Sequence, residues 1–216
     1  MMNLYIYCEG QTEESFVKNS LMSHFIQKNI ILYPIICRTK EGPNGIFKGG
    51  LTDYNKAVKE IKRLCTQHPN EKVTSFIDYY GLRNIPQVIY NGTDKYQLIL
   101  SIEQKFYEDV GCKNFIPYIS LHEFESLLFS KPIEFAYLKP TAVPKLNQIL
   151  NEFENNPELI NSGKETAPSK RILREIDNYS KVLDGTTIAK KISLLEIRNK
   201  CQHFNNWITI LEDTSI

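Results

Sequence analysis

Short apolar runs of β type alternate with amphipathic helix patterns over the first 130 residues, and this alternation restricts the fold more than any other feature of the chain. The β-type runs lie at residues 4–8, 30–37, 72–78 and 115–121. The helix patterns lie between them, at residues 12–27, 53–67 and 95–109. Strands that alternate with helices in this way are typical of a mostly parallel sheet. The pattern therefore predicts an α/β fold with a mostly parallel sheet of about four strands flanked by helices.

Two stretches within this region show neither pattern. Residues 41–50 are rich in glycine, and residues 79–93 contain Gly81, Pro86 and the pair Asn91-Gly92. Because glycine, proline and asparagine favour turns, both stretches are expected to be loops. A loop longer than about 12 residues is uncommon in a compact domain unless it has a function.

Beyond residue 132 prolines divide the chain into short helical stretches, and no β-type run is found. We therefore expect two parts, an α/β domain at residues 1–131 and a helical C-terminal part at residues 132–216 that packs on it. The apolar side chains expected to make this contact are Leu195, Ile197, Phe204, Trp207, Ile208 and Leu211.

The formal net charge of the 216-residue chain is +1, which argues against a protein whose whole surface binds nucleic acid and leaves room for a local basic face. No run approaches the roughly 18 apolar residues that a membrane span needs, and the first residues lack the pattern of a secretion signal. We therefore expect a cytoplasmic protein without a membrane partner.

Acidic residues end or directly follow three of the four apolar runs. Glu9 and Glu13 follow the first run, Asp78 ends the third, and Glu123 and Glu125 follow the fourth. In an open α/β sheet the parallel strands deliver their C-terminal ends to one edge, where residues far apart in sequence converge on a ligand. We therefore expect these five carboxylates to lie at a common site.

Three of these acids also have a structural explanation. Glu13 lies in the first turn of a helix, where the dipole alone favours an acid. Asp78 could cap the turn that follows it, and Glu123 completes a Ser-x-x-Glu capping box that begins at Ser120. Glu125 has no such role. Both interpretations of the three acids stay open on the sequence alone.

Carboxylates without a Cys or His cluster select Mg²⁺ or Mn²⁺ over zinc. These ions keep several water ligands and bind phosphate oxygens, so the implied chemistry is phosphoryl transfer or phosphodiester hydrolysis. No Ser-His-Asp order, P-loop or G-x-G-x-x-G motif indicates another reaction.

Residues 161–200 carry more basic than acidic side chains, which indicates a modest basic face. Within it, residues 166–171 look like a helix start, whose free N–H groups would bind phosphate together with Ser169, Lys170 and Arg171. Lys164 precedes this segment and would assist. The alternative is a solvated helix end with ordinary lysines.

Tyr79, Tyr80 and Arg83 begin the long loop beside the predicted acidic site. The aromatic rings of Tyr79 and Tyr80 could stack on unpaired bases, because every base has a π face. The alternative is a pair of tyrosines that pack against the edge of the sheet.

Five strings of the sequence together resemble the bacterial family DUF4276, and the resemblance extends over nearly the whole chain. The strings are Glu9-Gly10-Gln11-Thr12-Glu13, Phe76-Ile77-Asp78-Tyr79-Tyr80-Gly81, His122-Glu123-Phe124-Glu125-Ser126-Leu127-Leu128-Phe129, Thr166-Ala167-Pro168-Ser169-Lys170-Arg171 and Cys201-Gln202-His203-Phe204-Asn205-Asn206-Trp207.

Glu9-Gly10-x-x-Glu13 and Asp78-x-Tyr80 also resemble the signature of the Toprim fold. In that fold, which topoisomerases, primases and overcoming-lysogenization-defect (OLD) nucleases share, a Glu and a D-x-D pair bind magnesium. The resemblance implies a Toprim-like Rossmannoid domain with nuclease activity that works with an ATPase of the AAA or ABC type in an antiviral defence module. This sequence departs from the signature at Tyr80, since tyrosine is a poor magnesium ligand.

The leading hypothesis is therefore a nuclease that depends on Mg²⁺ or Mn²⁺ and acts on DNA or RNA. The catalytic residues would be Glu9, Asp78, Glu125 and Lys170. The metal ligands would be Glu9, Glu13, Asp78, Glu123 and Glu125. The phosphate and nucleic-acid ligands would be Lys164, Ser169, Lys170, Arg171, Tyr80 and Arg83.

Tyr80 at a ligand position favours a different class, a catalytically silent subunit that binds and regulates an ATPase partner. A phosphohydrolase or nucleotidyltransferase acting on a nucleotide is a third hypothesis. A homo-oligomer is compatible with each of them.

Overall fold

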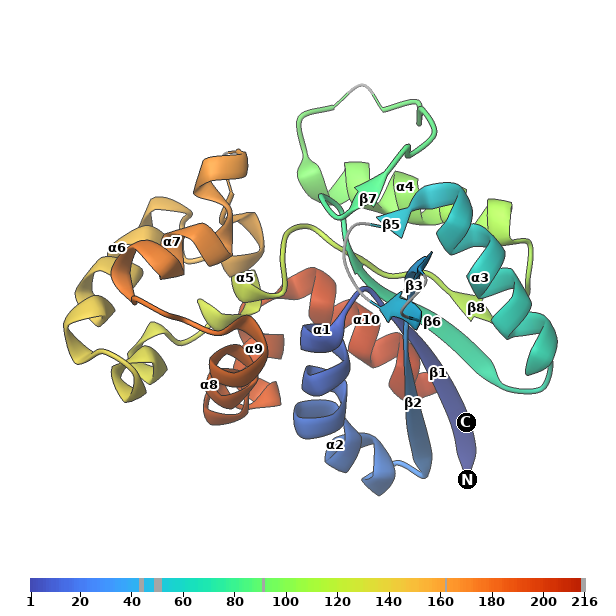
Figure 1. Ribbon diagram of the computed structural model, residues 1–216, viewed down its shortest axis with the longest axis horizontal. Coiled ribbons are helices and arrows are strands. Elements are labelled where there is room, and N and C mark those ends of the chain that lie inside the picture. The colour runs from blue at the N-terminus through green and yellow to red at the C-terminus, as the bar shows by residue number, and fades with distance from the viewer. Residues whose placement is uncertain (43–44, 49–51, 91, 162, 215–216) are drawn as a thin grey trace.

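The computed structural model of the chain describes residues 1–42, 45–48, 52–90, 92–161 and 163–214 (Figure 1). The side chains of residues 38–42, 45–48, 52 and 164 lie outside this description. Within these ranges, none of the helices has the length and apolar character that crossing a membrane requires.

A parallel sheet forms the centre of the N-terminal part, with strand order β2-β1-β6-β8 and β9 as a second partner of β6. The strands are β1 Met2–Cys8, β2 Ile30–Ile36, β6 Lys72–Asp78, β8 Phe115–Ile116 and β9 Ile119–Ser120. The predicted parallel α/β sheet is therefore confirmed. The fourth predicted strand is divided in two, because Pro117 lies in its middle and has no N–H to donate to a neighbouring strand.

Helices cover both faces of this sheet (Figure 1). One face carries a nearly continuous helix made of α1 Gln11–Phe16, the π-helical segment η1 Val17–Leu21 and α2 Met22–Gln27. The other face carries α3 Tyr54–Gln67 and α4 Lys95–Val110. The side chains of β1 alternate accordingly, since Leu4 and Ile6 belong to the hydrophobic cluster under α1 while Tyr7 belongs to the cluster under α3.

Capping residues explain where the two helices of the second face begin and end. Asp53 precedes α3 and accepts a hydrogen bond from the N–H of Lys56 at 3.1 Å, and Asp94 accepts one from the N–H of Tyr96 at 2.8 Å. Gly111 ends α4 in the left-handed conformation, with φ of 64°, which costs glycine little.

The two predicted loops contain short strands. Residues 38–48 include an antiparallel hairpin of β3 Arg38–Gly42 and β4 Gly45–Lys48, although residues 43–44 and 49–51 lie outside the described residues. In the long loop, β7 Leu82–Arg83 pairs in parallel with β5 Thr52–Asp53. Backbone pairing thus ties the start of the long loop to the chain just before α3.

All the regular secondary structure of the described chain beyond residue 120 is helical, which confirms the predicted helical C-terminal part. Its elements are α5 Glu125–Leu128, η2 Pro132–Tyr137, η3 Pro140–Ala142, α6 Val143–Glu152, η4 Pro157–Leu159, η5 Lys164–Thr166, α7 Pro168–Glu175, η6 Lys181–Gly185, α8 Thr186–Ile192, α9 Leu194–Lys200 and α10 Gln202–Asp213. Several begin at a proline, a residue whose fixed φ suits the first helical turn.

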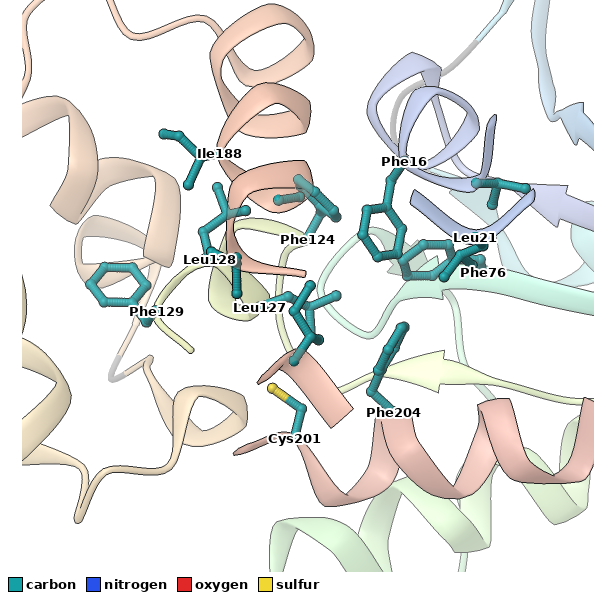
Figure 2. Packing of buried hydrophobic residues seen from close by; sticks show 14 of the residues in the cluster. Phe16, Leu21, Phe76, Phe124, Leu127, Leu128, Phe129, Ile188, Cys201 and Phe204 are labelled. Atoms are coloured by element: carbon teal, nitrogen blue, oxygen red, sulfur yellow. The ribbon is translucent and has the colours of Figure 1, made fainter. Parts of the chain in front are cut away.

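The C-terminal helices share a hydrophobic cluster with the sheet (Figure 2). Phe204 of α10 lies beside Phe16 of α1 at 6.0 Å between ring centroids, and the indole N–H of Trp207 donates to Thr74 of β6 at 2.9 Å. Of the six side chains predicted to make this contact, five are buried, but Leu195 is 66% exposed because it lies on the outer side of α9. A division at residue 131 stays a prediction, since this cluster is continuous across it.

Candidate functional site

A cavity of about 520 Å³ opens at the C-terminal ends of β1 and β6. We call it the acidic cavity after the charged side chains that line it, which are Glu9, Glu13, Asp78, Glu123, Glu125 and Lys181. All five carboxylates expected at a common site therefore line one cavity. The strands explain this, because β1 and β6 are parallel neighbours and end at the same edge of the sheet.

Glu9 and Asp78 lie closest to the sheet. The N–H of Asp78 donates to Oε2 of Glu9 at 3.2 Å, and the N–H of Gly81 donates to Oδ1 of Asp78. Asp78 thus caps the turn that follows β6, which is the structural role that the sequence allowed for it. It also lines the acidic cavity. A Cβ atom on Gly81 would lie 2.7 Å from Cδ of Glu9, which is too close. Any residue other than glycine would therefore displace this carboxyl group.

Glu13 also combines a helix-capping contact with a place in the cavity. Its Oε2 accepts a hydrogen bond from the N–H of Gly10 at 2.9 Å, at the start of α1. Both interpretations made from the sequence are therefore compatible with its position.

The second pair of carboxylates comes from the segment around α5. Phe124 is buried against Phe16 at 5.1 Å between ring centroids, and this contact fixes the segment next to α1 (Figure 2). Glu123 and Glu125, on either side of Phe124, line the acidic cavity. The predicted capping box is not formed, because Phe124 rather than Ser120 is the N-cap of α5 and makes no side-chain cap.

Lys181 is the cation of the site, and the sequence did not single it out. Its Nζ lies 3.1 Å from Oε1 of Glu123 and 3.5 Å from Oε2 of Glu125. It begins η6, a segment without helical periodicity beyond one turn, so its position depends on the packing of the C-terminal helices. One lysine among many basic residues in 161–200 offers no sequence signal for this role.

Burial and repulsion between neighbouring carboxylates raise the pKa of most acids in the cavity. Burial raises the pKa of Glu9 and of Asp78 above their usual ranges, and the charge of Asp78 raises that of Glu9 further. Burial also raises the pKa of Glu13 to about 7 and that of Glu125 to about 7. Only Glu123 has a lowered pKa, because Lys181 and Ser169 outweigh the effect of its burial.

Glu125 has an oxygen that no protein group satisfies. Its side chain is 2% exposed, Oε2 faces Lys181, and Oε1 has no hydrogen-bond partner among the residues that the structure describes. A buried carboxylate oxygen without a partner costs several kcal/mol of solvation unless a cation or a proton compensates it. This oxygen is therefore available to a ligand of the acidic cavity.

Within the described ranges, no three or more His, Cys, Asp or Glu side chains are placed to hold a metal ion together. One oxygen each of Glu9, Glu13 and Asp78 accepts a backbone N–H instead. Mg²⁺ often binds to proteins through one or two carboxylates and keeps its other water ligands. The all-oxygen donors and the unpaired oxygen of Glu125 fit such a hydrated ion better than a closed cage of protein ligands.

The predicted phosphate-binding residues Ser169, Lys170 and Arg171 do not line the acidic cavity. The N–H of Ser169 at the start of α7 donates to Oε2 of Glu123 at 3.0 Å, so an internal carboxylate takes the place expected for phosphate. Arg171 donates to the carbonyl of Thr166 at 2.8 Å and is partly buried. Lys170 is exposed and, like Ser169 and Arg171, is not among the residues that line the acidic cavity.

Of the other predicted nucleic-acid ligands, Tyr80 lines the acidic cavity and Arg83 does not. Arg83 is exposed in β7. The side chain of Lys164 lies outside the described residues.

The fold and the cavity define an α/β protein with a carboxylate-rich site at the C-terminal edge of a parallel sheet. Residues 8–212 match the family described as Domain of unknown function (DUF4276), so the chain belongs to this family. No curated protein and no solved structure matches the chain.

The Glu125→Gln substitution is expected to stabilise the metal-free protein at about pH 8 by roughly 1–3 kcal/mol and to change little at about pH 5. The pKa of Glu125 rises from 4.5 to about 7 on folding, so the free energy of unfolding falls as pH rises through this window. Glutamine cannot ionise and avoids this loss. Urea unfolding at both pH values, with a chelator present, measures the difference.

Glu108→Gln is the matched control, because Glu108 is exposed on α4, where its carboxylate accepts a hydrogen bond from the side chain of Gln104 at 2.8 Å. Glu108→Gln should change the free energy of unfolding by the same amount at both pH values. A loss of stability in Glu125→Gln at about pH 8 would show that the ionised carboxylate stabilises the fold.

Proposed function

We propose that the protein is a Toprim-type nuclease that hydrolyses phosphodiester bonds with Mg²⁺ or Mn²⁺. The observation that carries the proposal is the convergence of five carboxylates and Lys181 on one cavity at the C-terminal edge of the sheet. Five buried or half-buried carboxylates with a single lysine leave an excess of negative charge, which a divalent cation would neutralise. The substrate would be DNA or RNA, and the place of action the cytoplasm.

Glu9 and Asp78 would hold the cation, because they lie side by side at the ends of neighbouring strands. A bound cation would stabilise negative charge on the phosphate oxygens and lower the pKa of a water molecule. Glu125, with an unpaired oxygen and a pKa of about 7, suits the role of the base that takes a proton from the attacking water.

Lys181 would contact the phosphate of the substrate in place of Lys170. Its side chain is 44% exposed, and its Nζ lies within 3.5 Å of carboxylate oxygens of both Glu123 and Glu125. The two carboxylates raise the pKa of Lys181 more than its burial lowers it, so the ammonium group stays charged. A fixed ammonium group beside the reacting phosphate would stabilise charge that develops in the transition state.

A catalytically silent subunit of an AAA- or ABC-type ATPase is the second proposal, and Tyr80 favours it. Tyr80 stands two residues after Asp78, where the Toprim signature has its second acid, and its side chain is 49% exposed. An exposed aromatic ring at the rim of a cavity also suits protein recognition. Under this proposal the protein would not cleave nucleic acid under any metal condition.

Purified protein is expected to cleave single-stranded or double-stranded DNA or RNA with Mn²⁺ or Mg²⁺ and to lose cleavage with a chelator. Glu9→Gln and Asp78→Asn should each reduce the cleavage rate by about 100-fold or more, because each removes charge that holds the cation. Gel electrophoresis of labelled strands measures the rate.

Glu14→Gln is the matched control, since Glu14 lies one residue beyond Glu13 but pairs with Lys18 at 2.7 Å and does not line the cavity. It should cleave as the wild type does. Full activity in Glu9→Gln and in Asp78→Asn would contradict the assignment of the site.

Gly81→Ala is expected to reduce cleavage roughly 10- to 100-fold, because the new Cβ would displace the carboxyl group of Glu9. The double variant Gly81→Ala with Glu9→Gln should be no slower than Glu9→Gln alone, since both changes act through the same side chain. Rates that multiply in the double variant would show that Gly81 acts by another route.

A further inference from the structure

A second cavity, of about 230 Å³, lies against the acidic cavity. We call it the tyrosine cavity, and the lining residues that matter here are Tyr79, Tyr80, Lys95, Leu98 and His122. Tyr80 lines both cavities. In addition, His122 lines the tyrosine cavity, and the next residue, Glu123, lines the acidic cavity. A ligand that fills the tyrosine cavity would therefore touch a ligand bound in the acidic cavity.

His122 is the unusual group of this cavity. The residue is 2% exposed, yet neither ring nitrogen has a hydrogen-bond partner in the part of the chain that is described. Buried polar side chains are almost always hydrogen-bonded in folded proteins, so an unpaired donor and acceptor at a cavity wall indicate a missing partner. Neutral imidazole offers one N–H donor and one acceptor nitrogen.

Tyr80 covers this imidazole. The two rings are stacked, with centroids 5.3 Å apart and 28° between the planes, and Tyr80 as a whole is 49% exposed. A half-exposed ring at the start of a loop can shift without disturbing the core. Its movement would open the ring nitrogens of His122 to a planar ligand.

We propose that the tyrosine cavity binds one unstacked nucleobase of a single-stranded DNA or RNA segment, next to the phosphodiester in the acidic cavity. This inference rests on the proposed nuclease function. It assigns strands with unpaired bases as the substrate class. It also assigns His122 as the residue that recognises the base.

The size and chemistry of the cavity suit a single base. Its volume is below the roughly 300–1,000 Å³ of pockets that bind drug-sized ligands, so it would admit one ring system and leave the sugar outside. Tyr80 offers a face for stacking and Leu98 an apolar wall. The edge of a base carries hydrogen-bond donors and acceptors, which match the two nitrogens of His122.

Lys95 adds a cation at the rim. It is exposed, lines the tyrosine cavity, and its Nζ donates to the carbonyl of Asn161 at 3.4 Å. This position suits a contact with a carbonyl oxygen of the base or with the flanking phosphate. An apolar ligand would leave both nitrogens of His122 unpaired and is therefore disfavoured.

The test measures binding rather than cleavage. The probe is a short single-stranded oligonucleotide, made as DNA and as RNA, with one fluorescent base analogue whose emission is quenched by stacking. A second version carries an abasic site at that position. Titrations use the Asp78→Asn protein with a chelator, so that the strand stays intact, and compare it with the same protein carrying Tyr80→Ala or His122→Phe.

Binding is expected to quench the analogue, and Tyr80→Ala should weaken affinity by roughly 5- to 100-fold, the range for losing one stacked base. His122→Phe keeps the ring but removes both nitrogens, so it should weaken affinity while thermal unfolding shows no loss of stability. The abasic strand should bind all proteins equally weakly.

Tyr137→Ala is the matched control, because Tyr137 is 61% exposed in η2 and lines neither cavity. It should bind as its parent does. Equal affinity of the abasic and complete strands, or unchanged affinity in both Tyr80→Ala and His122→Phe, would overturn the inference. Equally tight binding of duplex and single strands would overturn it as well.

The two proposals fail in different ways. Base-dependent binding by a protein that never cleaves any strand would support the tyrosine cavity and contradict the nuclease. Metal-dependent cleavage that is equally fast on complete and abasic strands would support the nuclease and contradict the tyrosine cavity.

Discussion

The parallel pairing of β1 with β6 is the constraint on which the site depends. Cys8 lies opposite Phe76 in the register of the two strands, so Glu9, the next residue, and Asp78, two residues beyond Phe76, emerge at the same edge of the sheet. The carboxylate of Glu9 accepts the backbone N–H of Asp78 there, although 69 positions separate the two residues. Strand pairing is backbone chemistry supported by a buried core, so it can hold two acids together that would repel each other in a flexible chain.

The helical part completes what the sheet begins. Phe124 is anchored in the hydrophobic cluster and places Glu123 and Glu125 across the cavity, while η6 supplies Lys181 between them. This single ammonium group compensates Glu123 but leaves Glu125 with one oxygen unpaired. Packing thus gathers more carboxylates than cations in one partly buried cavity, and a divalent cation would compensate this surplus.

The sequence predicted the strands and the convergence of the acids because both follow from local patterns, namely apolar runs and the acids at their ends. It could not predict Lys181 or the contact between Glu123 and Ser169, since both arise from the packing of irregular helices without periodic signals. The phosphate site expected at residues 166–171 illustrates the same limit, because the sequence indicated the start of α7 but not the carboxylate of Glu123 that accepts the N–H of Ser169. Likewise, His122 carried no sequence signal beyond its place after a strand, and its unpaired nitrogens are visible only in three dimensions.

A crystal of the protein grown with Mn²⁺ tests the central claim most directly, through the anomalous scattering of the metal. The account predicts a peak in the acidic cavity at about 2.0–2.3 Å from a carboxylate oxygen of Glu9 and one of Asp78, with water at the remaining positions. A map without a peak there, from a crystal whose solution holds Mn²⁺ far above the protein concentration, would contradict it. So would a peak bound only by residues outside the cavity.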